Sequence, residues 1–228
     1  MATGATTGPC SARTPSLRAR EPSTPLPVGR SLDGVSLTEI EPGLLLAAPS
    51  LGDPNFEGTV VLLGAHSEEG SLGWTVNGPV IDDAATILRA TGLVGADAEL
   101  PPGFSHPARR GGPVSPETVW IVYVRQPGVD ALPDTIPIGD DLGVTATADA
   151  LRVLLAGGGP SEFRLLVGYA GWGPGQLARE LSLGAWLPAP AQAELLFGGD
   201  ASTLWRRAYA ETIGSVPAAF VSTTRGSA

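Results

Sequence analysis

The chain has 228 residues, 43% of them hydrophobic, and a net charge of −9, which suits one acidic globular domain with a sizeable core. All fourteen positive residues are arginine, so a Walker A lysine and every Schiff-base mechanism, pyridoxal phosphate enzymes included, are excluded. The single cysteine, Cys10, allows no disulfide framework and is compatible with the cytoplasm, and no apolar run approaches the roughly 18–20 residues of a membrane-spanning helix.

Residues 1–34 are predicted to form a disordered head, because they are rich in Ser, Thr, Pro, Gly and Arg and have no hydrophobic periodicity. Residues 1–30 hold four arginines and one acid, a net charge of +3, whereas the rest of the chain holds ten arginines and 22 acids, a net charge of −12. Three interpretations of the head stay open: a disordered extension or mis-chosen start, a targeting segment, and a functional basic arm. Since an acidic body repels a phosphate backbone, nucleic-acid binding by the body is disfavoured.

The body, residues 35–215, is predicted to be one domain, followed by a flexible tail at 216–228. The predicted strands are 43–49, 56–66, 71–77, 109–114, 117–124, 142–146 and 163–169, with short extended pieces at 185–187 and 194–197. The predicted helices are 81–92, 147–156, 176–183 and 200–213. Strands and helices mix without a regular βαβ repeat and hairpins are present, so we expect an α+β fold with a mixed or antiparallel sheet.

Residues 56–77 predict a β-hairpin around a four-residue turn. In this hairpin His66 faces Ser71, and Asn77 lies close to Val60 at the far end. His66 and Asn77 are then roughly 20 Å apart, because a strand rises by about 3.4 Å per residue. The two side chains should therefore not share one site.

A glycine-rich segment, residues 168–176 (GYAGWGPGQ), lies between a predicted strand and a predicted helix, where phosphate-binding loops are found. It does not match the pattern G-x-G-x-x-G. Two interpretations stay open: a tight structural turn, or a cradle for an anion or ligand that includes Trp172, Gly175 and Gln176. Among the five tryptophans, Trp172 is the one expected to be partly exposed because glycines flank it.

A polar patch formed by Asp53, Asn55 and Asn77, between Pro54 and Pro79, is the best candidate for a binding site. The competing interpretation is that these side chains cap turns at strand ends.

The two histidines, His66 and His106, have no further ligand pattern around them and define no metal site. We expect neither a metal nor another cofactor.

Four blocks of sequence stand in order along the chain, at residues 46–56, 66–79, 111–114 and 168–187. Together they resemble the YqgE/AlgH family of bacterial proteins. Residues 46–56 (LAAPSLGDPNF) are similar to A-x-P-x-L-x-D-P-x-F, and residues 66–79 to H-x-x-x-G-A-[LM]-G-x-x-[VI]-N-[RK]-P. Residues 111–114 (GGPV) and 168–187 resemble two further blocks, so the resemblance covers about residues 38–215.

The resemblance implies a compact α+β fold with bifurcated, coiled sheets and peripheral helices. The family is often labelled a transcriptional regulator, and no activity, cofactor or catalytic residue is assigned to it. This chain has Ala65 where the family often has Glu, Gly78 where it often has Arg or Lys, and a different end at residues 225–228. These departures lower the odds of an enzymatic role.

Three functional hypotheses follow. The first is a non-enzymatic, cytoplasmic regulatory or interaction protein that binds a protein partner or a small ligand through the Asp53/Asn77 and Gly171–Gly175 surfaces, with His66 and Gly112 as further candidate binding residues. The second is an enzyme or ligand-binding protein with an unrecognised site near Asp53 and Asn77. The third is direct transcriptional regulation, which the acidic body disfavours.

Overall fold

The structure is a computed structural model that describes residues 40–49 and 58–214. These residues belong to Leu37–Ala228, the larger of the two units into which the chain divides. The predicted head, the predicted tail and the patch residues Asp53 and Asn55 lie outside the described residues, so the boundaries at 34 and 215 stay predictions.

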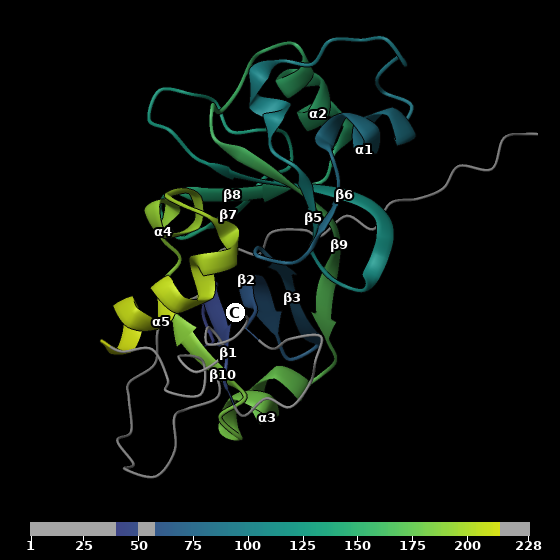
Figure 1. The fold of residues 1–228 in the computed structure, drawn as a ribbon. Helices are drawn as coiled ribbons and strands as arrows, with labels where there is room; N and C mark the ends of the chain where they lie inside the picture. Colours follow the sequence, from purple (N-terminus) through teal and green to yellow (C-terminus); the bar gives the residue numbers. More distant parts are fainter. Residues whose placement is uncertain (1–39, 50–57, 215–228) are drawn as a thin grey trace, which may run out of the picture. The chain divides into compact units, whose positions relative to one another are not determined.

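Within the described residues, ten strands form one sheet that is accompanied by short helices (Figure 1). The strands are β1 (Gly43–Ala47), β2 (Val60–Ser67), β3 (Gly70–Thr75), β4 (Val80–Asp82), β5 (Ala108–Arg110), β6 (Val114–Val124), β7 (Ile136–Ile138), β8 (Leu142–Thr145), β9 (Phe163–Trp172) and β10 (Trp186–Ala189). The helices are α1 (Ala84–Ala90), η1 (Pro102–Ser105), α2 (Ala148–Leu155), α3 (Gln176–Ser182), α4 (Ala193–Phe197), η2 (Ala201–Thr203) and α5 (Leu204–Ile213).

The strand order is β10-β1-β2-β3-β9-β6-β8-β7, and every neighbouring pair on this path is antiparallel. β5 pairs with β9 in parallel and carries β4 on its other side. The long strand β9 serves two groups of strands, because its last three residues pair with β3 and its earlier residues pair with β6 and β5. The predicted single-domain α+β fold with a curled, mostly antiparallel sheet is therefore confirmed.

Alternating side chains of β9 supply two separate cores, one on each side of the sheet. Phe163, Leu165 and Val167 pack in a cluster with residues of α1 and α2. Leu166 packs in a second cluster with residues of α4 and α5. Arg164 stands two residues before Leu166 in β9, so its side chain points to the same face of the sheet as that of Leu166. This is the face on which α4 packs.

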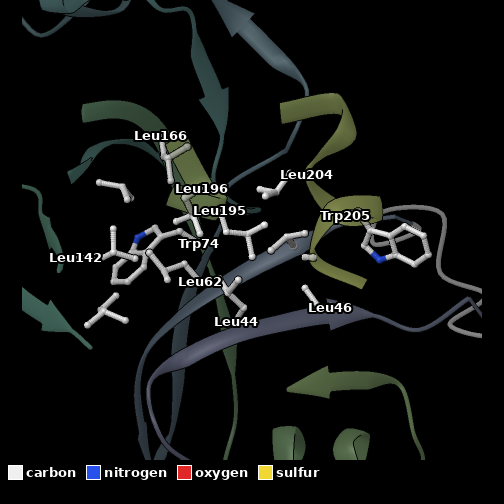
Figure 2. Close-up of a cluster of buried hydrophobic side chains, with 14 of the residues drawn as sticks. Leu44, Leu46, Leu62, Trp74, Leu142, Leu166, Leu195, Leu196, Leu204 and Trp205 are labelled. Carbon is white, nitrogen blue, oxygen red and sulfur yellow. The ribbon is translucent and has the colours of Figure 1, made fainter. Parts of the chain in front are cut away.

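Figure 2 shows the second cluster, in which Leu62 and Trp74 from the sheet meet Leu196 and Leu204 from α4 and α5. The C-terminal helix is also held by a polar contact, because the indole Nε1 of Trp205 donates to the Ala47 carbonyl of β1 over 2.9 Å. Apolar packing and this hydrogen bond together place α4, η2 and α5 over one face of the sheet.

The predicted hairpin is confirmed, with His66 opposite Ser71, but a bulge between Leu63 and Ala65 shifts the register by one residue over the rest of the hairpin. The helix predicted at 147–156 is also confirmed as α2, with the Thr147 hydroxyl accepting from the Ala150 amide over 3.2 Å.

Four predictions of secondary structure were wrong. The strand predicted at 109–114 ends at Arg110, and residues 111–113 join β5 to β6. Ile81 belongs to strand β4, and the helix starts only at Ala84, because the Asp83 carboxylate accepts from the Thr86 amide and fixes its beginning. Residues 194–197, predicted to be extended, lie in helix α4. Strand β9 continues through Gly171 to Trp172, so the predicted turn shrinks to residues 173–175.

Candidate functional site

Three of the predicted site residues lie at the hairpin end of β3. The Nδ1 atom of His66 and the hydroxyl of Ser71 are 2.7 Å apart, and Ser71 in turn pairs with Trp172 of β9. Gln176 begins α3 just beyond that strand. His66, Trp172 and Gln176 therefore share one region of the fold.

The prediction that Trp172 is partly exposed was wrong, since only 7% of the residue is accessible to solvent. Its indole Nε1 donates to Glu180 over 2.9 Å, and the indole of Trp186 donates to the same carboxylate oxygen over 2.8 Å. The other oxygen of Glu180 accepts from Gln176 over 2.9 Å. Glu180 thus fastens α3 to the ends of β9 and β10, which gives the glycine-rich block a structural role.

The turn before α3 is also explained by backbone geometry. Gly175 has a φ of 66°, the left-handed conformation that favours glycine. The amide of Gly173 donates to the Gln176 side chain over 3.1 Å, so this amide is already engaged within the protein. A ligand cradle at Trp172, Gly175 and Gln176 stays a prediction.

Asn77 and Gly112 lie near the opposite end of β3. The side-chain oxygen of Asn77 accepts from the Val60 amide over 2.8 Å, and its Nδ2 donates to the Gly58 carbonyl over 2.9 Å. A Cβ on Gly112 would lie 2.0 Å from the carbonyl carbon of Tyr169, so glycine lets two backbone segments cross. Both contacts have a folding role, and binding at these residues stays a prediction.

The predicted site residues that the structure describes therefore form two groups at the two ends of β3, one with His66 and Trp172 and one with Asn77 and Gly112. The structure does not bring Asn77 and Trp172 to a common concavity.

A cavity of about 210 Å³, which none of the sequence patterns predicted, opens between the sheet and the segment that joins α4 to η2. Its polar lining comes from His106 after η1, Arg109 of β5, Arg164 of β9 and Asp200 before η2. The apolar lining consists of Val76, Val122, Leu166, Leu196 and Phe197. Pro107, Gly199 and Ala201 complete the wall.

Strand pairing places the two arginines of the cavity close together on one face of the sheet. Arg109 pairs in parallel register with Leu166, and Arg164 lies two residues before Leu166 on the same face of β9. Like charges at this diagonal position on neighbouring strands repel each other. The arrangement costs stability in the absence of an anion, and this favours a binding role for the two side chains.

Each of the two guanidinium groups is held by a hydrogen bond to backbone. Nη1 of Arg109 donates to the Gly78 carbonyl over 2.9 Å, and Nη1 of Arg164 donates to the Phe163 carbonyl over 3.1 Å. The guanidinium of Arg164 also lies over the ring of Phe197, 4.9 Å from its centre. Because a guanidinium carries five N–H donors, each group keeps donors for a ligand while its position is fixed.

In the part of the chain that the structure describes, neither Arg109 nor Arg164 forms an ion pair with a carboxylate. Among the described residues, the single ion pair within 4 Å joins Arg152 and Asp149 on α2, outside the cavity. The Asp200 carboxylate at the rim is engaged in accepting from the Ser202 amide over 2.8 Å. The cavity is therefore a cationic site in an acidic protein.

The ionisation of the lining groups reflects this concentration of positive charge. Burial lowers the pKa of the Arg164 guanidinium, Glu162 opposes this change, and Arg109 adds to it. Burial also lowers the pKa of the His106 imidazole, and the charge of Arg164 lowers it further. The pKa of Asp200 is lowered mainly by its hydrogen bonds from Ser202, with smaller contributions from Arg109 and Arg207. Perturbed groups gathered in a concavity are typical of functional sites.

A third arginine lies behind the cavity wall. A Cβ on Gly199 would be 3.3 Å from the Cζ atom of Arg207. The Nε and Nη2 atoms of Arg207 are buried, and within the described part of the chain no acceptor lies within hydrogen-bonding distance of them. Arg207 adds positive potential to the same side of the cavity.

The sequence contained one sign of this site that was not used. Arg164 interrupts the apolar run of residues 163–169 at a position where alternation points the side chain inward. Its neighbours come from η1, β5 and η2, and the parallel pairing of β5 with β9 cannot be seen in the local sequence.

Fold and site together define an α+β protein with a curled, mostly antiparallel sheet and an arginine-lined cavity beside it. The chain belongs to the AlgH-like family, which matches residues 44–216, and the resemblance seen in the motifs is thereby confirmed. A UPF0301 protein of Anaeromyxobacter dehalogenans is 36% identical over 192 residues, which cover 80% of this chain and 92% of that protein. A UPF0301 protein of Sphingopyxis alaskensis is 33% identical and covers 81% of this chain and 94% of its own length.

Two solved structures are similar. The solution structure of the AlgH protein from Pseudomonas aeruginosa has a TM-score of 0.63 and 32% identity, and the match covers 86% of this chain and 100% of that chain. A crystal structure of a Corynebacterium diphtheriae protein has a TM-score of 0.60 and 27% identity, with 81% of this chain and 93% of that chain covered. In addition, no helix of the described residues is long and apolar enough to cross a membrane.

Proposed function

We propose that this AlgH-like protein is a non-enzymatic regulatory protein that binds a small anionic ligand in the cavity lined by Arg109 and Arg164. The observation that carries the proposal is the pair of anchored guanidinium groups that share one cavity and form no ion pair with any carboxylate of the described residues. Ten arginines stand against 22 acids after residue 30, so partners for such cations are abundant in this chain. Two neighbouring arginines without a partner therefore favour an anion from outside the protein.

The lining of the cavity supports binding over catalysis. Its residues include no Ser, Thr, Cys or Lys that could serve as a nucleophile. The guanidinium groups stay charged at any physiological pH and supply donors, not proton transfer. His106 and Asp200 supplement the arginines at the rim.

The test is isothermal titration calorimetry of the full chain with inorganic phosphate, acetate and benzoate. We expect at least one of these anions to bind with one-to-one stoichiometry and a Kd of about 1 mM or tighter. In the Arg164→Gln variant, the affinity should fall by about tenfold or more, because a hydrogen bond to a charged group contributes about 1.5–3 kcal/mol.

Arg152→Gln is the matched control, since Arg152 is an exposed arginine of α2 outside the cavity. Its anion affinity should equal that of the unmodified protein. The proposal is wrong if none of the three anions binds, or if Arg164→Gln and Arg152→Gln behave alike.

A further inference from the structure

The lining of the cavity combines two kinds of group, and this combination narrows the class of ligand beyond the proposed function, on which this inference rests. The two guanidinium groups lie among apolar side chains, because Arg164 pairs with Val122 and Arg109 pairs with Leu166 on neighbouring strands. Val76, Leu196 and Phe197 add to the apolar lining. An inorganic anion would contact the cationic groups alone, whereas an organic anion would also cover the apolar side chains and remove them from water.

The size of the cavity limits the apolar part of the ligand. A cavity of about 150 Å³ with an apolar lining is large enough for benzene, whereas sites for cofactors and drug-sized ligands measure about 300–1,000 Å³. At about 210 Å³, the cavity has room for one ring and an acidic group. A nucleotide is too large for it.

The charge of the lining limits the acidic part of the ligand. Arg109 and Arg164 contribute two positive charges, and Asp200 contributes one negative charge. His106 is neutral near pH 7, because its pKa is lowered from an ordinary value of 6.5. The charges in the lining therefore sum to about +1, which matches a monoanion, and Arg207 strengthens the positive potential from behind the wall without being part of the lining.

The ring of Phe197 provides a surface for the apolar part. It is half-buried and lies against Arg164, whose guanidinium is 4.9 Å from the ring centre. A flat ligand placed beside Phe197 keeps its acidic group within reach of Arg164. If the flat part of the ligand is an aromatic ring, this ring and the ring of Phe197 pack in an offset or edge-to-face arrangement.

We propose that the cavity binds a small organic monocarboxylate whose apolar body is no larger than a single ring. Benzoate has the size and charge of this class and serves as the probe.

The experiment compares five ligands on the full chain by isothermal titration calorimetry: benzoate, acetate, inorganic phosphate, phenyl phosphate and adenosine monophosphate. We expect benzoate to bind about tenfold or more tightly than acetate and phosphate, because it buries a ring. Benzoate should also bind more tightly than phenyl phosphate, and adenosine monophosphate should give no heat of binding above dilution.

A substitution in the apolar lining checks where the ring binds. Phe197→Leu keeps an apolar side chain but removes the ring, so benzoate affinity should fall about threefold or more while acetate affinity stays the same. Leu183→Ala is the control, because Leu183 is 77% exposed and lies outside the cavity. Melting curves of both variants show whether they are folded, and the ligand series on the unmodified protein is independent of them.

The outcomes separate this inference from the proposed function. If acetate or phosphate binds as tightly as benzoate and Arg164→Gln abolishes that binding, the inference is overturned and the proposed function stands. If phenyl phosphate or adenosine monophosphate binds most tightly, the assigned charge or size is wrong. If no ligand of the series binds, both the inference and the proposed function fail.

Discussion

At the scale of single residues, Glu180 shows how one carboxylate can hold three elements together. It accepts from the indoles of Trp172 and Trp186 and from the amide of Gln176, so it ties α3 to the ends of β9 and β10. Hydrogen bonds to a charged acceptor are stronger than neutral ones. Glu180, Trp172 and Trp186 are also the residues that made the block at 168–187 distinctive in the sequence.

Replacing this carboxylate tests its structural role. Glu180→Ala removes the shared acceptor of two buried indoles, so the free energy of unfolding should fall by about 3 kcal/mol. Urea denaturation followed by tryptophan fluorescence measures the change. Glu211→Ala, which alters an exposed residue of α5, should change the free energy of unfolding by less than about 0.5 kcal/mol. Equal stability of the two variants would contradict this role of Glu180.

The candidate site illustrates what the sequence could and could not predict at this scale. The contact between His66 and Ser71 was predictable, because a short turn fixes which residues face each other. The grouping of His106, Arg109 and Arg164 was not, because it depends on a parallel strand pair between distant segments. The side chain of Asn77 was correctly placed near Val60, but only the structure shows that both its polar atoms bind backbone groups.

At the scale of elements, long apolar segments were predicted best. β2, β6 and β9 have β-branched and aromatic residues over many positions, so packing on the sheet agrees with their intrinsic preference. The errors of conformation fell on short elements, namely β4 and α4, whereas for β5 and β9 only the positions of their ends were wrong. The two short elements have three to five residues, which is too short for the spacing of apolar residues to distinguish a helix from a strand. Their conformation is set by the neighbouring elements on which they pack.

The two strands that end the main sheet path each contain a proline. Pro188 lies in β10, and Pro137 lies in β7. A proline cannot donate a hydrogen bond to an added strand, so both ends resist pairing with another chain.

Glycines allow the crossing of the β5–β6 connection over β9. A Cβ on Gly112 would lie 2.0 Å from the carbonyl carbon of Tyr169, and backbone cannot yield there as a flexible side chain would. We therefore expect Gly112→Ala to lower the free energy of unfolding by about 4 kcal/mol or more, or to prevent folding. Thermal unfolding followed by circular dichroism measures the loss. Gly95→Ala is the matched control, because no atom lies within 4 Å of its added Cβ and its φ is not positive.

At the scale of the whole molecule, the distribution of charge joins the fold to the proposed function. A body that is strongly acidic attracts few anions in general, so binding of an anion depends on the local field of the cavity. That field comes from Arg109 and Arg164, with Arg207 behind the wall and with Asp200 as the opposing charge at the rim.

His106 makes this binding depend on pH. In the free protein its pKa is lowered from 6.5 by burial and by the charge of Arg164. A bound carboxylate offsets the charge of Arg164, so the pKa of His106 rises on binding and the complex takes up a proton. Affinity should therefore increase as the pH falls below about 6.5, by at most about tenfold per pH unit for one proton. Asp200 stays ionised over this range because its own pKa is lowered.

Titrations of benzoate between about pH 5 and pH 8 measure this dependence, since a carboxylate ligand stays mostly ionised over that range. The His106→Gln variant keeps a polar side chain that does not titrate, so its affinity for benzoate should be independent of pH. The same substitution should remove a loss of stability in the free protein at low pH. A depressed histidine pKa means that the unfolded chain binds more protons, and stability therefore falls as the pH drops from about 6.5 toward the lowered pKa. An unchanged pH dependence of benzoate binding in His106→Gln would place the responsible proton on another group and remove His106 from the site.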